Sequence, residues 1–225
     1  MYETLNGSNS DRYQYVLPSY NFNKNLYLEN IAGNLNFNSS GNNTLKDTNV
    51  STTTFFNDLN YSTLNNFLDN GIKTNFEIFL KNVNTVGKNN PKYEDNPQSE
   101  LMSAYAYNVS LPMIKKTYTG INKLEPKLSL RLSPHDMKNN RELERRIDIN
   151  NIFNSNRLSM NDSFESGESI TLGLNFKKEK IKTRNSISEI EEYIDFKIAS
   201  VFRFKEEKNM PTKSTLNKKK SNIFG

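Results

Sequence analysis

The segment that decides the fold class is Ile194-Asp195-Phe196-Lys197-Ile198-Ala199-Ser200-Val201-Phe202-Arg203-Phe204, in which apolar and polar side chains alternate almost throughout. Successive side chains of a β-strand point to opposite faces, so the large apolar residues share one face and Asp195, Lys197 and Arg203 share the other. Charges between apolar neighbours are difficult to bury in a soluble helix, but they are natural on a strand with one wet face. The segment is therefore predicted to be a two-faced β-strand.

The same period of two recurs along the rest of the chain. Strong examples are Tyr105–Met113, Leu128–Leu132 and Ile170–Phe176, and weaker ones are Tyr13–Tyr15, Tyr20–Phe22, Leu35–Phe37, Val50–Phe56, Leu59–Tyr61 and Phe76–Leu80. Strings of turn-forming residues separate these segments, at Asn38–Asn43, Gly87–Pro97, Pro134–Asn140 and Asn161–Gly167. The pattern predicts an all-β, antiparallel sheet of about 8–10 strands, each roughly 9–11 residues long.

The composition suits a two-faced sheet better than a large soluble core. Only 34% of the 225 residues are apolar, and the mean hydropathy is −0.78. Roughly one residue in six is Asn, a turn former that is far above its average usage. Either much of the chain is disordered, or its strands place only alternate residues on an apolar face, as a membrane barrel with a wet interior does. Composition alone leaves both possibilities open.

Charge and residue usage exclude several classes of function. The net charge of +5 is mild and spread along the chain, whereas a nucleic-acid interface needs a concentrated basic face. Two local excesses of positive charge are predicted to be solvated loops. They comprise Lys218, Lys219 and Lys220, and Lys177, Lys178, Lys180, Lys182 and Arg184. The absence of Cys rules out disulfides and thiolate chemistry, and the single histidine, His135, cannot form a His-rich metal site.

Targeting signals are equally sparse. No apolar run is long enough for a transmembrane helix. Met1 to Asp11 lacks the basic and apolar regions of a signal peptide, so an exported protein would have to be represented here by a fragment that has lost its signal. No phosphate-binding glycine loop, paired-carboxylate motif or nucleophile elbow is found, and we expect no catalytic, cofactor-binding or metal-binding residues and no enzyme activity.

Pattern alone leaves two β architectures about equally favoured. In a membrane barrel the apolar face contacts lipid, and aromatic residues gather near strand ends, where Tyr13, Tyr20, Tyr61, Tyr105 and Phe204 are predicted to lie. In a soluble β-sandwich the same aromatics fill the core between two sheets. The long polar loops and the small apolar content favour the barrel slightly. The charged segment Met137–Asn154 is interpreted as a loop that leads into a strand.

Two further stretches of the sequence form motifs. The first, Leu124-Glu125-Pro126-Lys127-Leu128-Ser129-Leu130-Arg131-Leu132-Ser133-Pro134, follows a strand ending Ser110-Leu111-Pro112-Met113-Ile114-Lys115-Lys116. It is similar to the LEPR-strand-SP pattern of the LPS-assembly protein LptD (OstA) family, with Lys127 in place of the commoner Arg. The second runs from Asn151-Ile152-Phe153-Asn154-Ser155-Asn156-Arg157-Leu158-Ser159-Met160-Asn161-Asp162 through Glu165 and Gly167 to Leu172-Gly173-Leu174-Asn175-Phe176. It departs from the family pattern at Asn154, Met160 and Ser163. The clear resemblance covers residues 99–204.

The resemblance implies a role in the envelope of Gram-negative bacteria. Residues 1–225 would be an interior part of the family's C-terminal outer-membrane β-barrel, an open sheet without the signal peptide and the periplasmic domain. The implied function is insertion of lipopolysaccharide into the outer leaflet of the outer membrane. The implied partners are lipopolysaccharide, an LptE-like plug lipoprotein, outer-membrane lipid, and the periplasmic bridge protein LptA through the missing N-terminal domain. No cofactor and no nucleic acid is implied.

Four residues of the motifs carry specific expectations. Pro126 cannot donate to a β-ladder, so it is predicted to mark a strand entrance. Arg157, Asp162 and Glu165 are predicted to form ion pairs that brace a loop on the inner wall of the barrel; direct contact with the transported glycolipid is the alternative.

Three other classes of protein remain open at this point. They are a different outer-membrane barrel such as a porin or a receptor, a secreted soluble β-sandwich protein, and a largely disordered Asn- and Lys-rich protein. An open sheet with an apolar face exposes both edges and that face to water, so residues 1–225 alone are predicted not to be a stable monomer in buffer.

Overall fold

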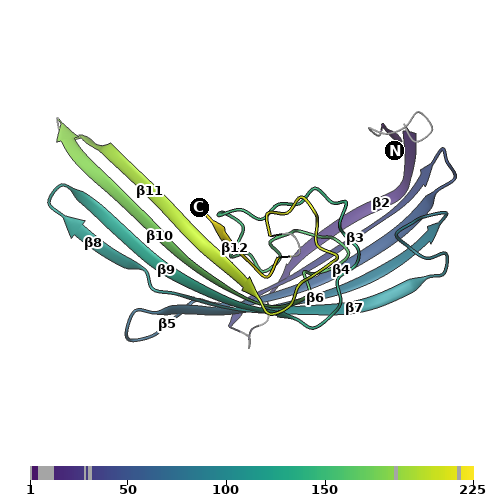
Figure 1. The fold of residues 1–225 in the computed structure, drawn as a ribbon, viewed down its shortest axis with the longest axis horizontal. Coiled ribbons are helices and arrows are strands. Elements are labelled where there is room, and N and C mark those ends of the chain that lie inside the picture. Colours follow the sequence, from purple (N-terminus) through teal and green to yellow (C-terminus); the bar gives the residue numbers. More distant parts are fainter. Residues whose placement is uncertain (1, 5–12, 28, 30–31, 185–186, 217–218) are drawn as a thin grey trace. The chain divides into compact units, whose positions relative to one another are not determined.

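A computed structural model describes residues 2–4, 13–27, 29, 32–184, 187–216 and 219–225. Within these residues the secondary structure consists of twelve β-strands (Figure 1). They are β1 (Tyr2–Thr4), β2 (Tyr13–Leu26), β3 (Gly33–Lys46), β4 (Ser51–Thr63), β5 (Asn66–Phe67), β6 (Lys73–Lys88), β7 (Gln98–Ser110), β8 (Met113–Thr117), β9 (Gly120–Ser133), β10 (Gly167–Arg184), β11 (Ile187–Arg203) and β12 (Ser221–Phe224). No helix among the described residues is long and apolar enough to cross a membrane.

The strands pair in a simple up-and-down order. Hydrogen-bonded neighbours follow the path β1-β2-β3-β4-β6-β7-β9-β10-β11-β12, with β5 beside β6 and β8 beside β9. Pairing is antiparallel wherever the register is defined, as in β9, β10 and β11. The predicted all-β, antiparallel and open sheet is confirmed. Ten strands form the continuous path, and the short strands β5 and β8 lie beside it.

The chain divides into two compact units, and each is described separately. Unit 1 comprises Met1–Ser62, Ile78–Ala104 and Met160–Phe164. Unit 2 comprises Thr63–Glu77, Tyr105–Ser159 and Glu165–Gly225. Strands β4, β6 and β7 contribute to both units, and the long connection between β9 and β10 contributes its residues 160–164 to unit 1.

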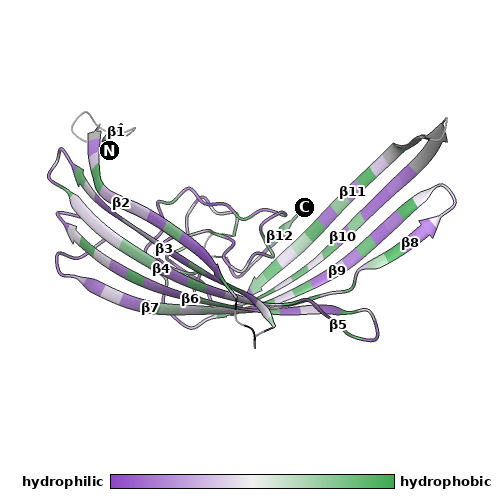
Figure 2. Cartoon of the chain, turned by 180° about the vertical axis from the view of Figure 1, so that it is seen from behind, coloured by the Kyte–Doolittle hydropathy of each residue, from purple (hydrophilic) through white to green (hydrophobic). Residues whose placement is uncertain are grey.

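In unit 2 the strand register separates two kinds of side chain. One row across β7, β9, β10 and β11 consists of Ala106, Arg131, Ser169 and Arg203, all of them buried. The next row consists of Tyr107, Leu130, Ile170 and Phe202, three of which are exposed and one half-buried. Alternating hydrophobic and hydrophilic bands along these strands are visible in Figure 2. The sheet therefore has an apolar face, which is exposed, and a polar face, which other parts of the chain cover.

In unit 1 a small hydrophobic core lies against β6 and β7. Its members are Val83, Met102, Ala104 and Phe164, with Phe56 and Phe79 packed against them. Phe164 is contributed by the β9–β10 connection, and its ring stands edge-on to Phe79, with the centroids 6.3 Å apart. The connection is thus anchored in unit 1 by an aromatic side chain.

Strand lengths and two strand boundaries differ from the predictions. The long strands have 13 to 18 residues, rather than roughly 9–11, because pairing continues beyond the apolar part of each strand. The segment Tyr105–Met113 is not one strand, since β7 ends at Ser110 and β8 begins at Met113. Pro112, which has no N–H to donate, lies in the break.

Pro126 lies inside β9 rather than at a strand entrance, so that prediction is wrong in position. Its neighbours on one side change at this point, because β8 pairs as far as Leu124 and β7 begins to pair at Lys127. The Pro126 carbonyl accepts a hydrogen bond from the N–H of Leu111 at 3.1 Å. The carbonyl and the nitrogen of a strand residue point to the same side, so the Pro126 nitrogen, which carries no hydrogen, faces the break between β7 and β8. Proline is tolerated here because no ladder hydrogen bond is lost.

The predicted turn at Asn38–Asn43 is also wrong, because these residues lie within β3. Threonines of the neighbouring strand β4 hydrogen-bond their amides: Thr54 Oγ1 donates to Asn42 Oδ1 at 2.9 Å, and Thr53 Oγ1 donates to Asn43 Oδ1 at 3.1 Å. Cross-strand bonds of this kind stabilise a strand of weak β-formers.

Other expectations are corrected in detail. Lys177, Lys178 and Lys180 lie in β10 rather than in a loop, and the side chains of Lys182 and Arg184, like Lys218, lie outside the described residues. Met137–Asn154 is a loop as predicted, but it leads into no strand before β10. Of the expected aromatic ends, Tyr61 and Phe204 lie near the ends of β4 and β11. Tyr13 is the first residue of β2, as predicted, whereas Tyr20 and Tyr105 lie well inside their strands.

Candidate functional site: a loop-covered polar face

Two loops of unit 2 form a folded insert over the polar face of β9, β10 and β11. The insert consists of residues 134–159 and 204–216. The Asp148 carboxylate accepts the N–H groups of Asn150 and Asn151 at 2.8 and 3.0 Å, which fixes a turn of the kind that Asp favours. Backbone bonds from Asn140 to Asn209 and from Thr212 to Arg141 join the two loops. Large apolar side chains of both loops are fully buried, namely Ile147, Ile152, Leu158, Met210 and Leu216.

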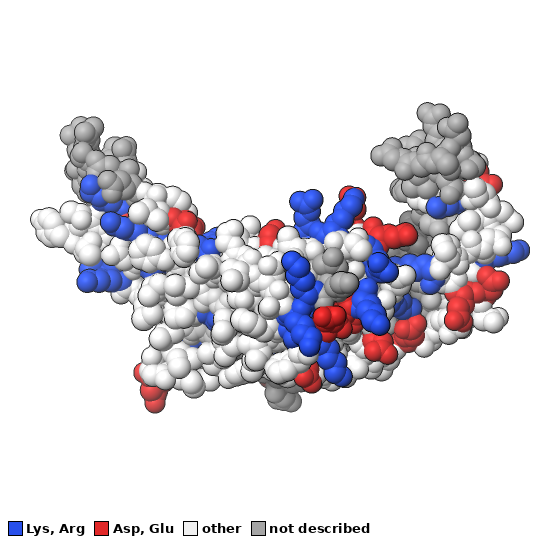
Figure 3. Space-filling view, viewed as in Figure 1, with Lys and Arg blue, Asp and Glu red and all other residues white. Residues whose placement is uncertain are grey.

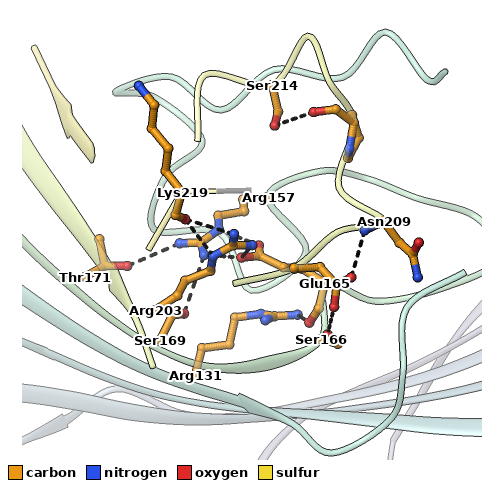
Figure 4. Close-up of polar contacts among 12 residues, drawn as sticks. Arg131, Arg157, Glu165, Ser166, Ser169, Thr171, Arg203, Asn209, Ser214 and Lys219 are labelled. Atoms are coloured by element: carbon orange, nitrogen blue, oxygen red, sulfur yellow. Dashed lines mark hydrogen bonds and ion pairs between the residues drawn. The ribbon is translucent and has the colours of Figure 1, made fainter. Parts of the chain in front are cut away.

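The insert is attached to the strands by a buried cluster of charged residues, shown in Figure 4. Arg157 donates two parallel hydrogen bonds to Glu165, from Nε to Oε2 at 2.7 Å and from Nη2 to Oε1 at 2.6 Å. The same guanidinium lies 3.4 Å from the hydroxyls of Ser169 and Thr171 on β10. Arg157 and Glu165 are only 3% and 2% exposed, so solvent screens this pair little.

Two further arginines reach the cluster from the sheet. Arg131 on β9 donates from Nε to the carbonyl of Ser155 at 2.9 Å and from Nη2 to the carbonyl of Glu165 at 2.6 Å. Arg203 on β11 donates to the carbonyl of Lys219, and its Nη1 lies 3.7 Å from Glu165 Oε1. The register explains the convergence, since both arginines face Ser169 from opposite sides.

The charge in this cluster is unbalanced. Three guanidinium groups surround the single carboxylate of Glu165. Burial alone would raise the pKa of Glu165, but Arg157, Arg131 and Arg203 outweigh it and hold that pKa at about 2. Glu165 is therefore ionised at any physiological pH, and removing it would leave buried positive charge without a counter-ion. We call Arg131, Arg157, Arg203 and Glu165 the clasp. Its charge balance depends on Glu165.

The predicted ion pair between Arg157 and Glu165 is confirmed, but Asp162 belongs to a different set of contacts. In unit 1, Asp162 Oδ2 lies 2.6 Å from Lys92 Nζ and accepts the hydroxyl of Tyr93 at 2.8 Å. Burial, the Asp162 charge and this hydrogen bond raise the pKa of Tyr93. All three motif residues thus make contacts that brace the connection between β9 and β10.

A polar pocket beside the clasp was not predicted. It has a volume of about 420 Å³ and lies in unit 2 between the polar faces of β6, β7 and β9 and the tip of the insert. The side chains that define it are Lys73, Asn75, Glu77, Asn108, Lys127 and Phe153. Their alternation with apolar neighbours in the sequence signals a polar face, but nothing in the sequence indicates which loop residue lies over them.

The pocket is ordered by a chain of side-chain hydrogen bonds. Ser129 Oγ donates to Asn108 Oδ1 at 2.6 Å, and Asn108 Nδ2 donates to Asn75 Oδ1 at 3.0 Å. Asn75 Nδ2 lies 3.4 Å from Glu77 Oε1, and the hydroxyl of Ser155 donates to the other oxygen of Glu77. Wall and insert therefore share one network.

The apolar face has the dimensions of a bilayer core. On β10 the outward positions Ile170, Leu172, Leu174 and Phe176 are apolar, and exposed Glu168 and Lys178 flank them. The ten residue steps of about 3.4 Å from Glu168 to Lys178, tilted by about 40°, separate these two charges by about 26 Å, close to the roughly 25 Å band of outer-membrane barrels. Figure 3 shows charged side chains gathered over the loops, while the surface over β9–β11 is largely uncharged.

These features define the class of protein. A soluble β-sandwich would pack such apolar faces against each other, whereas Leu130, Leu172 and Phe202 are exposed. An open antiparallel sheet with one exposed apolar face and one polar, loop-covered face has the two-faced construction typical of the wall of a membrane β-barrel. The sequence model of the LptD family, described as LPS transport system D, matches residues 1–225, so the chain belongs to this family. No curated protein matches the chain.

Proposed function

We propose that this chain forms part of the wall of the outer-membrane translocon that inserts lipopolysaccharide into the outer leaflet. Membership of an LPS transport family supports the substrate. The observation that carries the proposal is the division of each strand in unit 2 between an exposed apolar face of bilayer height and a polar face under the insert. Such a wall can lie in a membrane and line a hydrated interior at the same time.

The two faces would have different tasks in transport. Lipid contacts the apolar face, where Leu130, Leu172 and Phe202 need no hydrogen-bond partner. The polar face offers amide, hydroxyl and charged groups that can replace the water around a saccharide. Wall residues would bind and guide the molecule without any chemical step, so the proposal requires no catalytic group, and the energy would come from elsewhere.

The partners follow from the family and are part of the proposal. A plug lipoprotein of the LptE type would lie against the polar side of the wall, and LptA would deliver lipopolysaccharide through a periplasmic domain. The cellular location is the outer membrane of a Gram-negative bacterium.

The membrane orientation can be tested with single-cysteine variants, because the chain has no cysteine of its own. A fluorescent thiol probe at Leu172→Cys should be quenched by brominated lipid in isolated outer membranes, whereas a probe at Asn108→Cys should be quenched only by a water-soluble quencher. Equal aqueous quenching at both positions would contradict the two-faced wall.

Transport itself is tested by depletion of the whole protein in its host. Newly made lipopolysaccharide should then stop reaching the cell surface, as measured by surface labelling of pulse-labelled cells. The control is an unrelated outer-membrane barrel whose depletion should leave surface labelling unchanged. Normal delivery after depletion of this protein would refute the transport role.

A further inference from the structure

The polar pocket of unit 2 has the character of a ligand site. We propose that it binds a sugar unit carrying an anionic substituent, with Asn108 and Phe153 contacting the ring and Lys73 contacting the charge. This inference rests on the proposed function, since it identifies where on the polar face the saccharide of the transported glycolipid is held.

The size of the pocket limits what can enter. Its volume of about 420 Å³ lies at the lower end of the range of small-ligand sites, about 300–1,000 Å³. A whole lipopolysaccharide is far larger than this, but one portion of its saccharide fits. The pocket would therefore bind only one portion of the saccharide at a time.

The amides in the pocket are held in fixed positions. Asn108 uses one lone pair of its oxygen for Ser129 and one N–H for Asn75. An amide has two N–H donors and two lone pairs, so Asn108 retains one donor and one acceptor side by side. Adjacent hydroxyl groups of a sugar ring match this pair, and no side-chain ordering has to occur on binding.

Phe153 provides the apolar part of the site. Its ring lies directly on β10 at Gly173, where an added Cβ would be only 2.5 Å from Phe153 Cζ. Lys127 Nζ lies 5.8 Å from the ring centroid, within the range of a cation–π contact. The ring is thus fixed at the pocket wall, where it can pack against the C–H groups of a sugar.

The lysines of the pocket indicate where an anionic group would bind. The lining carries two lysines and two carboxylates. Lys127 lies 3.2 Å from Glu125, and Glu77 is hydrogen-bonded by Ser155 and Asn75. Among the described residues no carboxylate lies within ion-pair distance of half-buried Lys73, so Lys73 is the cation to which a carboxylate or phosphate on the sugar would bind.

The test is photo-crosslinking in living cells with the full-length protein and its own lipopolysaccharide. A photoreactive amino acid is placed at Ser110, which lines the pocket and leaves the amide chain intact, or at Asn175, which lies on the same face outside the pocket lining. A third probe at Leu172, on the apolar face, provides the background. The readout is the yield of lipopolysaccharide adduct at each position.

Lys73→Gln should lower the adduct yield at Ser110 about tenfold, the factor expected for loss of a hydrogen bond to a charged group, and leave the yield at Asn175 unchanged. Lys73→Arg should retain the yield, and Lys115→Gln on exposed β8 is the matched control. An unchanged adduct yield at Ser110 in Lys73→Gln, or an equal loss of yield at Asn175, would refute the proposed binding of an anionic sugar in this pocket. Absence of adducts at both Ser110 and Asn175 would instead refute the proposed function.

Discussion

Replacement of Glu165 by glutamine removes the only carboxylate of the buried clasp and keeps the shape of the side chain. Arg157 loses both of its charged bonds, and Arg131 and Arg203 lose the counter-charge nearest to them. The three guanidinium groups remain buried, because the register of the strands and the packing of the insert hold them there. The insert should therefore detach from the sheet more readily, while the strands stay paired.

The magnitude follows from the burial of the pair. Removal of one partner from a buried ion pair costs about 3–5 kcal/mol, because the other charge is left uncompensated. The pH dependence has a defined sign. The folded-state pKa of Glu165, about 2, lies below its ordinary value of 4.5, so its contribution to stability is complete above pH 4.5 and is lost as the pH falls toward 2.

Hydrogen exchange of residues 147–165, measured by mass spectrometry on the full-length protein in lipid nanodiscs, provides the assay. A loss of about 3 kcal/mol in the free energy of opening speeds exchange at least about a hundredfold. Glu144→Gln is the matched control, since Glu144 lies in the same loop and pairs with Lys213 at the exposed surface. Equal exchange rates in Glu165→Gln and in the native protein would refute the role of the clasp. Glu165→Gln has no carboxylate at this position, so a loss of protection below pH 4.5 in this variant would show that the pH dependence does not come from Glu165.

Three further substitutions test the packing of the wall. Gly173→Val should displace the ring of Phe153 and destabilise the fold by about 1–3 kcal/mol in urea titrations, and Phe153→Ala in the same chain should relieve most of the loss. Leu172→Arg should cost about 2–4 kcal/mol when folding into lipid vesicles is measured, because the residue lies in the middle of the apolar band. Asp58→Asn leaves Lys81, 3% exposed, without its partner at 2.6 Å and should cost about 3–5 kcal/mol, with Lys81→Met restoring stability in the double variant.

The two faces of β9–β11 could be predicted from sequence because a period of two has only one structural meaning when charges alternate with large apolar residues. Each strand of this region carries such a pattern, and antiparallel pairing then places like with like, as with Leu130, Ile170 and Phe202. The Arg157–Glu165 pair could also be predicted, since these two opposite charges lie only eight residues apart in one motif, whereas the contacts of Asp162 with Lys92 and Tyr93 could not.

The rest depended on information that local sequence does not contain. The Asn38–Asn43 segment has the composition of a turn, but a neighbouring strand supplies its hydrogen bonds, and tertiary context overrides propensity. Arg131 and Arg203 meet Glu165 only because of a register that joins residues 72 positions apart, from 131 to 203. The pocket likewise requires knowledge of where the tip of the insert lies, and loops have no periodicity from which to read that.

The richness in Asn, which left disorder open as an interpretation of the composition, has a physical explanation in unit 1. On the face opposite the core of that unit, the hydroxyls of Tyr20 and Ser39 lie 3.1 Å apart, Ser39 donates to Asn57 at 2.7 Å, and Asn57 donates to Asn82 at 3.2 Å. Asn84 also donates to Asn82, at 2.6 Å. Polar side chains at a lipid boundary are costly only when their hydrogen bonds are unmade. A chain of amides that bond one another across strands can therefore replace apolar residues at the edge of a membrane band, and low mean hydropathy is compatible with a membrane wall.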